Sequence, residues 1–148
     1  MAAMGRVAIA APAYAVQQVD VAAQAIVRRR APAGHRRAGL AFARTELFFG
    51  TAKREGAVTP DEFNRFLDEV VTPLFPDGLT VTKMAGQFRG EDGVTVKEDS
   101  YVLVLMYPAE RLEASSANID LIRTSYMRQH QQESVLRVDD PYLVWVSF

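Results

Sequence analysis

The alternation of apolar and polar residues over residues 41–148 predicts an ordered series of strands and helices. In residues 43–50 the side chains of Thr45, Leu47 and Phe49 share one face, which is typical of a strand with a buried side. Apolar residues then recur at helical spacing over residues 59–74, and again from Ser115 or Ser116 to residue 131. Between and after these helices, apolar runs predict strands at residues 79–89, 94–107 and 142–148.

Local signals mark the start of the first helix and the turns between strands. Thr59 suits the N-cap, Pro60 the first helical position and Glu62 the capping-box position. The Pro-Asp-Gly sequence at residues 76–78 ends this helix, and the Asp-Gly pair at residues 92–93 is a strong hairpin signal. The boundaries of the predicted elements therefore rest on turn and cap chemistry as well as on periodicity.

The predicted order is strand, helix, strand, strand, helix, strand. This order is typical of the ferredoxin-like βαββαβ fold, in which a four-stranded antiparallel sheet carries two helices on one face. The helices cover one face only, so the other face is expected to present an apolar patch of the kind that serves a dimer interface or a ligand cleft. We therefore expect a homodimer that forms through the open sheet face.

Residues 1–40 differ in composition from this domain and are expected to be a tail outside it. Residues 1–37 carry six Arg and one Asp, whereas residues 38–148 carry eleven Lys or Arg and seventeen Asp or Glu. The apolar run at residues 7–11 precedes a small-x-small triplet at residues 13–15, which resembles a degenerate secretory signal. The segment is therefore either such a signal or an Ala/Arg/Pro-rich tail.

The composition limits the chemistry. The chain has no Cys, which excludes disulfides, thiolate metal sites and cysteine nucleophiles. The acidic balance of residues 38–148 disfavours nucleic-acid binding, and no run approaches the roughly 20 apolar residues of a transmembrane helix. His35 and His130 lie far apart in the sequence, and His130 is expected on a solvated helix surface. We expect neither a metal nor a cofactor.

Strand parity identifies candidate binding residues on the central hairpin. With a two-residue turn at residues 92–93, Gln87 faces Glu98, and a four-residue loop would leave them on the same face. Ser100 also lies on that face. A carboxylate among valines requires a partner or an altered pKa, because an unpaired buried charge is unfavourable.

Further polar residues lie on the neighbouring segments. Glu46 is a carboxylate flanked by apolar residues on the first strand, which neighbours the third strand in this fold, and Gln132 and Glu133 follow the second helix. One interpretation is a pocket in which Glu98 or Glu46 acts as general acid or base. The other is a buried polar network that fixes strand register, and Gln132 and Glu133 either add polar groups or cap the helix.

Several short segments together resemble a bacterial family known as domain of unknown function 3574, over about residues 44–138. They are Thr45-Glu46-Leu47-Phe48-Phe49-Gly50, residues 66–73, residues 75–81 with Pro76-Asp77-Gly78-Leu79-Thr80, Gly86-Gln87-Phe88, Glu98-Asp99-Ser100 and Gln132-Glu133-Ser134-Val135. The resemblance implies no activity, cofactor or catalytic residue. It does imply family polar positions that match Glu46, Gln87, Glu98, Ser100, Gln132 and Glu133.

Resemblance to exported members of this family favours a periplasmic or extracellular location, with a cytoplasmic one as the alternative. The sequence therefore predicts a small-molecule-binding or accessory protein of the bacterial cell envelope. The alternative is a cofactor-free enzyme of isomerase or hydrolase type that uses Glu98 or Glu46 as general acid or base. The catalytic residues and the ligand stay unassigned.

Overall fold

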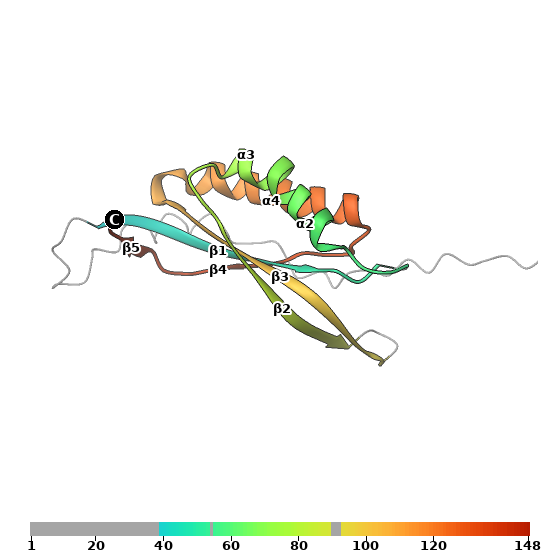
Figure 1. Cartoon of the computed structure of the whole chain (residues 1–148). Coiled ribbons are helices and arrows are strands. Elements are labelled where there is room, and N and C mark those ends of the chain that lie inside the picture. The colour runs from blue at the N-terminus through green and yellow to red at the C-terminus, as the bar shows by residue number, and fades with distance from the viewer. Residues whose placement is uncertain (1–38, 54, 90–92) are drawn as a thin grey trace, which may run out of the picture. The chain divides into compact units, whose positions relative to one another are not determined.

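The computed structural model describes residues 39–53, 55–89 and 93–148 (Figure 1). The predicted tail or signal segment covers residues 1–40, and its residues 1–38 lie outside the described residues. In the described part of the chain, no helix is both long enough and apolar enough to cross a bilayer.

A single antiparallel sheet holds the described strands together. The order across the sheet is β2-β3-β1-β4, and β5 pairs with β1. This arrangement confirms the predicted ferredoxin-like α+β fold. The strands are β1 (Leu40–Gly50), β2 (Thr80–Arg89), β3 (Thr95–Pro108), β4 (Leu136–Asp139) and β5 (Val144–Val146).

Both predicted helices are present. The first comprises α2 (Pro60–Phe66), a π-helical turn η1 (Leu67–Val71) and α3 (Thr72–Leu74) in direct succession. The second comprises a 3₁₀ turn η2 (Ala109–Arg111) followed by α4 (Leu112–His130).

The two helix starts show how far local signals extend. At α2 the predicted capping box is confirmed: the Glu62 N–H donates to Thr59 Oγ1 at 3.2 Å, and the Thr59 N–H donates to Glu62 Oε2 at 2.7 Å. The predicted Ser cap of α4 is wrong, because the helix already begins at Leu112 and Ser115 is buried within it.

The helices cover one face of the sheet, and the core lies between the two layers (Figure 1). Alternate β1 residues, among them Leu47 and Phe49, point into this core. An aromatic cluster fills its centre, where the Phe63 and Tyr101 rings stack with centroids 3.8 Å apart. Tyr126 of α4 packs edge-on against Phe49 at 4.7 Å. These contacts join the first helix, the second helix and the two central strands.

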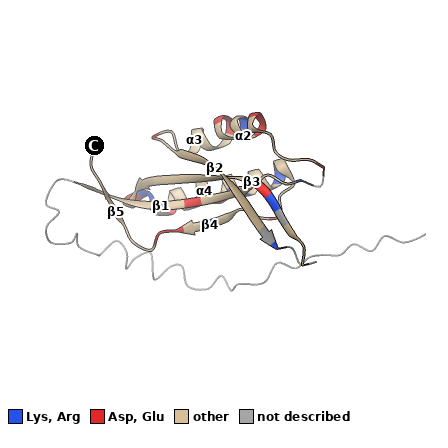
Figure 2. Ribbon diagram, turned by 60° about the horizontal axis from the view of Figure 1, so that its bottom comes forward, with Lys and Arg blue, Asp and Glu red and all other residues tan. Residues whose placement is uncertain are grey.

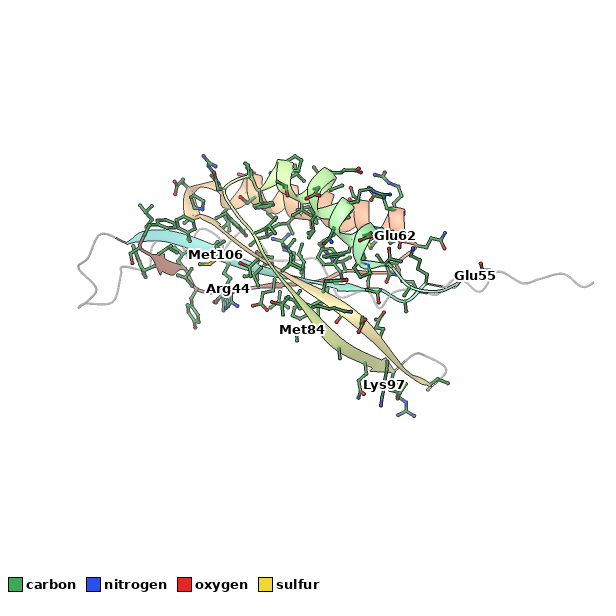
Figure 3. The ribbon with its side chains drawn as sticks, viewed as in Figure 1. Arg44, Glu55, Glu62, Met84, Lys97 and Met106 are labelled. Atoms are coloured by element: carbon green, nitrogen blue, oxygen red, sulfur yellow. The ribbon has the colours of Figure 1, made fainter. Side chains whose placement is uncertain are left out.

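The opposite face of the sheet carries apolar side chains that no described helix covers. Arg44 and Met84 project from this side (Figure 3). The exposed fraction is 47% for Met84, 41% for Met106 and 44% for Val138. We call this side the open face.

The register of the central hairpin differs from the predicted one. Gly86, not Gln87, pairs with Glu98, and Gln87 pairs with Lys97. Arg89 pairs with Thr95, so residues 90–94 connect the strands and the connection has an odd number of residues. Both predicted loops had an even number of residues. Because side chains alternate between faces, this shift of one residue puts Gln87 and Glu98 on opposite faces.

The last predicted strand is also different. Two short strands replace it, and β4 begins at Leu136, before the predicted start at residue 142. The pairing of β4 with β1 and that of β5 with β1 are offset, so residues 140–143 interrupt the edge. The Asp140 N–H donates to the Arg44 carbonyl at 3.0 Å within this interruption.

Candidate functional site

The candidate site lies where β1 ends, beside the charged part of β3. Charged residues of β3 are confined to Lys97, Glu98 and Asp99, toward the hairpin (Figure 2). The half-buried Glu98 turns its carboxylate toward the segment that leaves β1. Its Oε2 accepts hydrogen bonds from the Thr51 N–H at 2.9 Å and from the Ala52 N–H at 2.6 Å. Two backbone donors thus hold one oxygen of this carboxylate in a fixed position.

Gln132 reaches the same place from the far side of β1. The chain turns at Gln131, which adopts a left-handed conformation with φ 56° at the end of α4. The Gln132 side-chain Nε2 then donates to the Ala52 carbonyl at 2.7 Å. Glu98 and Gln132 therefore both bind the backbone just beyond Gly50, one from β3 and one from the segment after α4.

Both side chains also approach the position that a side chain of residue 50 would occupy. A Cβ atom at Gly50 would lie 2.9 Å from Glu98 Oε1 and 3.2 Å from Gln132 Oε1. The backbone at Gly50 does not have the positive φ that would favour glycine. The absence of a side chain, and not backbone freedom, is therefore what this position contributes.

Tyr126 supports the site from the core. Its hydroxyl donates to the Gly50 carbonyl at 2.8 Å, and its side chain is fully buried. Burial, with a smaller contribution from the negative charge of Glu98, raises the pKa of Tyr126 well above its ordinary value. The phenol therefore stays protonated and keeps donating to Gly50 across the physiological pH range.

Ser100 lies beside this cluster on the same face. It pairs with Gly50 on one side and with Met84 on the other. Its hydroxyl donates to the Met84 carbonyl at 3.4 Å, a long bond, and a Cβ at Gly86 would lie 3.2 Å from the same Oγ. The hydroxyl is thus directed toward β2, and it borders the site formed by Glu98 and Gln132.

The structure separates the other three candidate residues from this cluster. Glu46 forms an ion pair with Arg44, and its strand neighbours are Val104 and Val138. Gln87 lies on the face opposite Glu98, so its predicted pairing is wrong, and Glu133 is exposed. The first and third strands are neighbours as predicted, but their register places Glu46 beside Val104, whereas Glu98 lies at the backbone beyond Gly50.

Glu46 belongs instead to a depression of about 300 Å³ at the interrupted edge of the sheet. The depression combines charged and apolar walls. It is lined by Arg44, Glu46, Val138, Asp139, Asp140 and Pro141.

Thr45, the neighbour of Glu46 in β1, lies on the core side of the sheet. It is fully buried, and its hydroxyl donates to Asp139 Oδ1 at 2.7 Å and lies 2.9 Å from the Tyr107 hydroxyl. Burial is the main reason that the pKa of Tyr107 is raised. This network links β1, β3 and β4 and serves the packing of the strands.

The sequence interpretation missed Gly50 and Tyr126. A glycine at the end of an apolar strand is a known mark of close approach by another group, and it was the available signal for Gly50. Nothing local indicated Tyr126, whose role depends on the packing of α4.

The expectation for His130 is also wrong. It is 7% exposed, not solvated, and its Nε2 has no hydrogen-bond partner among the described residues. Burial and the nearby charge of Lys53 lower the pKa of His130, against a smaller opposite effect of Glu62. The described residues hold no cluster of three or more His, Asp or Glu side chains placed to bind a metal ion.

Fold and site together define a small ferredoxin-like domain with a polar cluster at one end of its open face. The chain belongs to the family described as protein of unknown function (DUF3574), whose family model matches residues 44–148. Comparison with the curated proteins gives no match.

Solved structures share the fold at low sequence identity. A phage SAM lyase in complex with S-methyl-5'-thioadenosine is 13% identical, with a TM-score of 0.55, over 78% of this chain and 95% of the lyase chain. The phage SAM lyase in its apo state gives a TM-score of 0.53 at 13% identity, over 76% of this chain and 95% of that one. CutA from Synechococcus elongatus PCC7942 gives 0.47 at 14% identity, over 72% and 82% of the two chains. At this identity the similarity to the phage SAM lyase establishes the fold alone.

Proposed function

We propose that this domain is a small-molecule-binding module whose recognition site is the cluster of Glu98 and Gln132 above Gly50. The observation that carries the proposal is the convergence of two polar side chains from distant segments over a position that has no side chain. Both side chains are bound to the Ala52 backbone. A site fixed by backbone contacts on a packed sheet is preorganised, so little ordering is required when a ligand binds.

The position of the cluster also favours a ligand. Glu98 and Gln132 are half-buried, and Glu98 lies on the same face of the sheet as Met84, the open face. The helices leave this face uncovered (Figure 1). Beneath them, Tyr126 holds the end of β1 from the buried side. A small molecule could therefore reach the polar groups from solvent while the core below stays closed.

The test is native mass spectrometry of the full chain purified from bacterial cells, followed by a thermal-shift screen of small metabolites. S-methyl-5'-thioadenosine belongs in the screen, because the phage SAM lyase of the same fold binds it. A ligand that stabilises the wild type and Glu113→Gln, which alters an exposed carboxylate of α4, but not Glu98→Gln, supports the site. Failure of every ligand to depend on Glu98 overturns it.

The same experiment separates binding from catalysis. The Oε1 atom of Glu98 accepts no hydrogen bond from a described residue, and this free oxygen favours an acid–base role as the second candidate function. If a bound molecule is chemically converted by the wild type and remains intact with Glu98→Gln, the domain is an enzyme. Binding without conversion assigns it to the binding modules.

We further propose that the domain forms a homodimer through the open face. On this face the exposed Met106 lies beside Arg44, and the exposed Val138 lies beside Glu46. Apolar side chains therefore border one positive and one negative side chain. In a two-fold interface the same patch meets itself, and Arg44 of one copy would face Glu46 of the other. This arrangement pairs both charges while it buries the apolar rim.

The dimer is tested by light scattering of the full chain after gel filtration. Val138→Asp on the open face should give a monomer. Each copy would contribute one new carboxylate, so the interface would contain two uncompensated negative charges. Leu121→Asp is the matched control, because Leu121 is 55% exposed on α4, on the helical side of the domain. A wild type that elutes as a monomer, or equal effects of both variants, refutes the interface.

An exported location, which the family resemblance implies, is part of the same proposal. Cell fractionation of a bacterium that produces the full chain, with intact-mass measurement of the product, tests it. Recovery of a shortened chain outside the cytoplasm supports export, and recovery of the complete chain in the cytoplasm contradicts it.

A further inference from the structure

Two oxygen atoms in the candidate site lack hydrogen-bond donors among the described residues. Glu98 Oε2 accepts both backbone N–H groups, so Glu98 Oε1 is left over. The Gln132 amide group donates through Nε2 to the Ala52 carbonyl at 2.7 Å and more weakly to the His130 carbonyl at 3.4 Å. Because only the NH₂ end can donate to carbonyl oxygens, these bonds direct Gln132 Oε1 to the other side.

The two free oxygens lie near each other on the same side of Gly50. One point, the position that a Gly50 Cβ would occupy, lies 2.9 Å from Glu98 Oε1 and 3.2 Å from Gln132 Oε1. Both atoms are hydrogen-bond acceptors, and one belongs to a carboxylate. Acceptors that face one another without a donor between them repel, whereas a donor that bridges them relieves the repulsion.

The described residues supply no cation to this place. None of the ion pairs formed by the described residues includes Glu98. Lys53, which follows Ala52 directly, is paired with Glu62 at 3.0 Å. Lys97, adjacent to Glu98, lies on the opposite face of β3. The local charge at the free oxygens is therefore negative.

We propose that the site binds the primary ammonium or amidinium group of a small molecule, whose N–H donors bridge Glu98 Oε1 and Gln132 Oε1. This inference rests on the proposed function and specifies its ligand class. A hydrogen bond from a cationic donor to a carboxylate is about twice as strong as a neutral one, which favours a cation over an alcohol. An anion would be repelled by Glu98. A Ca²⁺ ion would require about six to eight oxygen ligands, more than this pair provides.

The test is an NMR titration of the full chain with three probes of similar size: n-butylammonium chloride, tetramethylammonium chloride and n-butanol. The readout is the amide resonances of Thr51 and Ala52, whose N–H groups bind Glu98. We expect saturable shifts with n-butylammonium alone. Tetramethylammonium carries the positive charge without N–H donors, so it tests whether the donors are needed. The n-butanol molecule carries a donor without the charge, so it tests whether the charge is needed.

Two variants make the test specific. In Glu98→Gln the new amide can keep its oxygen on the Thr51 and Ala52 N–H groups and direct its NH₂ toward Gln132 Oε1. The variant would satisfy the site internally, and its affinity for n-butylammonium should fall at least tenfold. Glu113→Gln removes an exposed carboxylate of α4, outside the cluster, and should leave the affinity unchanged. Gly50→Ala places a methyl group against Glu98 Oε1 and Gln132 Oε1 without altering the charge, and it should also abolish binding.

The outcomes separate the two proposals. Shifts with n-butanol or tetramethylammonium equal to those with n-butylammonium overturn the ligand class but leave a binding site at Glu98. Unchanged n-butylammonium affinity in Glu98→Gln overturns the assignment of the atoms. The absence of shifts with every probe also overturns the inference, and the metabolite screen then decides separately whether the proposed function stands.

Discussion

Replacement of Gly50 by alanine tests the geometry of the site directly. The new Cβ would lie 2.9 Å from Glu98 Oε1, which is closer than such contacts allow, and it would lie tightly against Gln132 Oε1 at 3.2 Å and Glu98 Oε2 at 3.3 Å. The Gly50 backbone accepts an L-residue, since its φ is not positive. The clash must therefore be relieved by movement of the Glu98 carboxylate.

The magnitude follows from the bonds that this movement breaks. A hydrogen bond to a charged group contributes about 1.5–3 kcal/mol, and displacement of the carboxylate loses most of at least one of its two backbone bonds. Replacement of glycine by alanine stabilises the folded state by about 0.4–1 kcal/mol, because the unfolded chain loses entropy. We expect Gly50→Ala to lower the free energy of unfolding by about 1–2 kcal/mol in net terms.

The assay is urea denaturation followed by circular dichroism, applied to the four members of a double-mutant cycle. The other single variant is Glu98→Ala, which removes the group that the alanine at position 50 would strike. In that background Gly50→Ala should raise the free energy of unfolding by about 0.4–1 kcal/mol. The coupling between the two positions should then be about 1.5–3 kcal/mol, as expected for residues in contact.

Equal destabilisation by Gly50→Ala in both backgrounds would refute this reasoning. It would mean that the cost arises from Gln132 or from strain in β1, and not from Glu98. A crystal structure of Gly50→Ala with the Glu98 carboxylate unmoved would refute it as well.

Three further predictions concern the helices. Thr59→Ala should lower the free energy of unfolding by about 1 kcal/mol in urea, because the capping bond to Glu62 is lost, whereas Thr59→Ser should retain it. Gln131→Gly should raise the thermal midpoint, with a gain of up to about 1 kcal/mol, because the left-handed φ of 56° strains a residue with a side chain; a similar gain with Gln131→Ala would contradict this cause. The pKa of His130 lies below its ordinary value of 6.5, chiefly through burial and also through Lys53, so the folded state favours the neutral ring. Its contribution to stability is therefore complete above pH 6.5 and is lost as the pH falls below that value, a slope that His130→Phe should flatten in denaturation curves measured between pH 6.5 and 5.

Local chemistry in the sequence determined the elements and their order. The capping box at Thr59 and the alternation along β1 each depend on residues close together in the chain, so both could be predicted. The order of the elements then restricts the topology, and the β2-β3-β1-β4 sheet agrees with the prediction. Glu98 was also identified, because a carboxylate in an apolar strand requires partners.

Only the tertiary structure decided which polar residues meet. The hairpin connection has an odd number of residues, and a change of one residue moves Gln87 to the other face, which the Asp-Gly signal alone does not specify. The start of α4 depends on packing, which overrides the local capping preference of Ser115. Gln132 reaches Glu98 because β1 lies between β3 and β4, so segments more than thirty residues apart in the sequence converge beyond its end. Periodicity assigns a side chain to a face, whereas register and packing decide which side chains face one another, and those depend on contacts distant in the sequence.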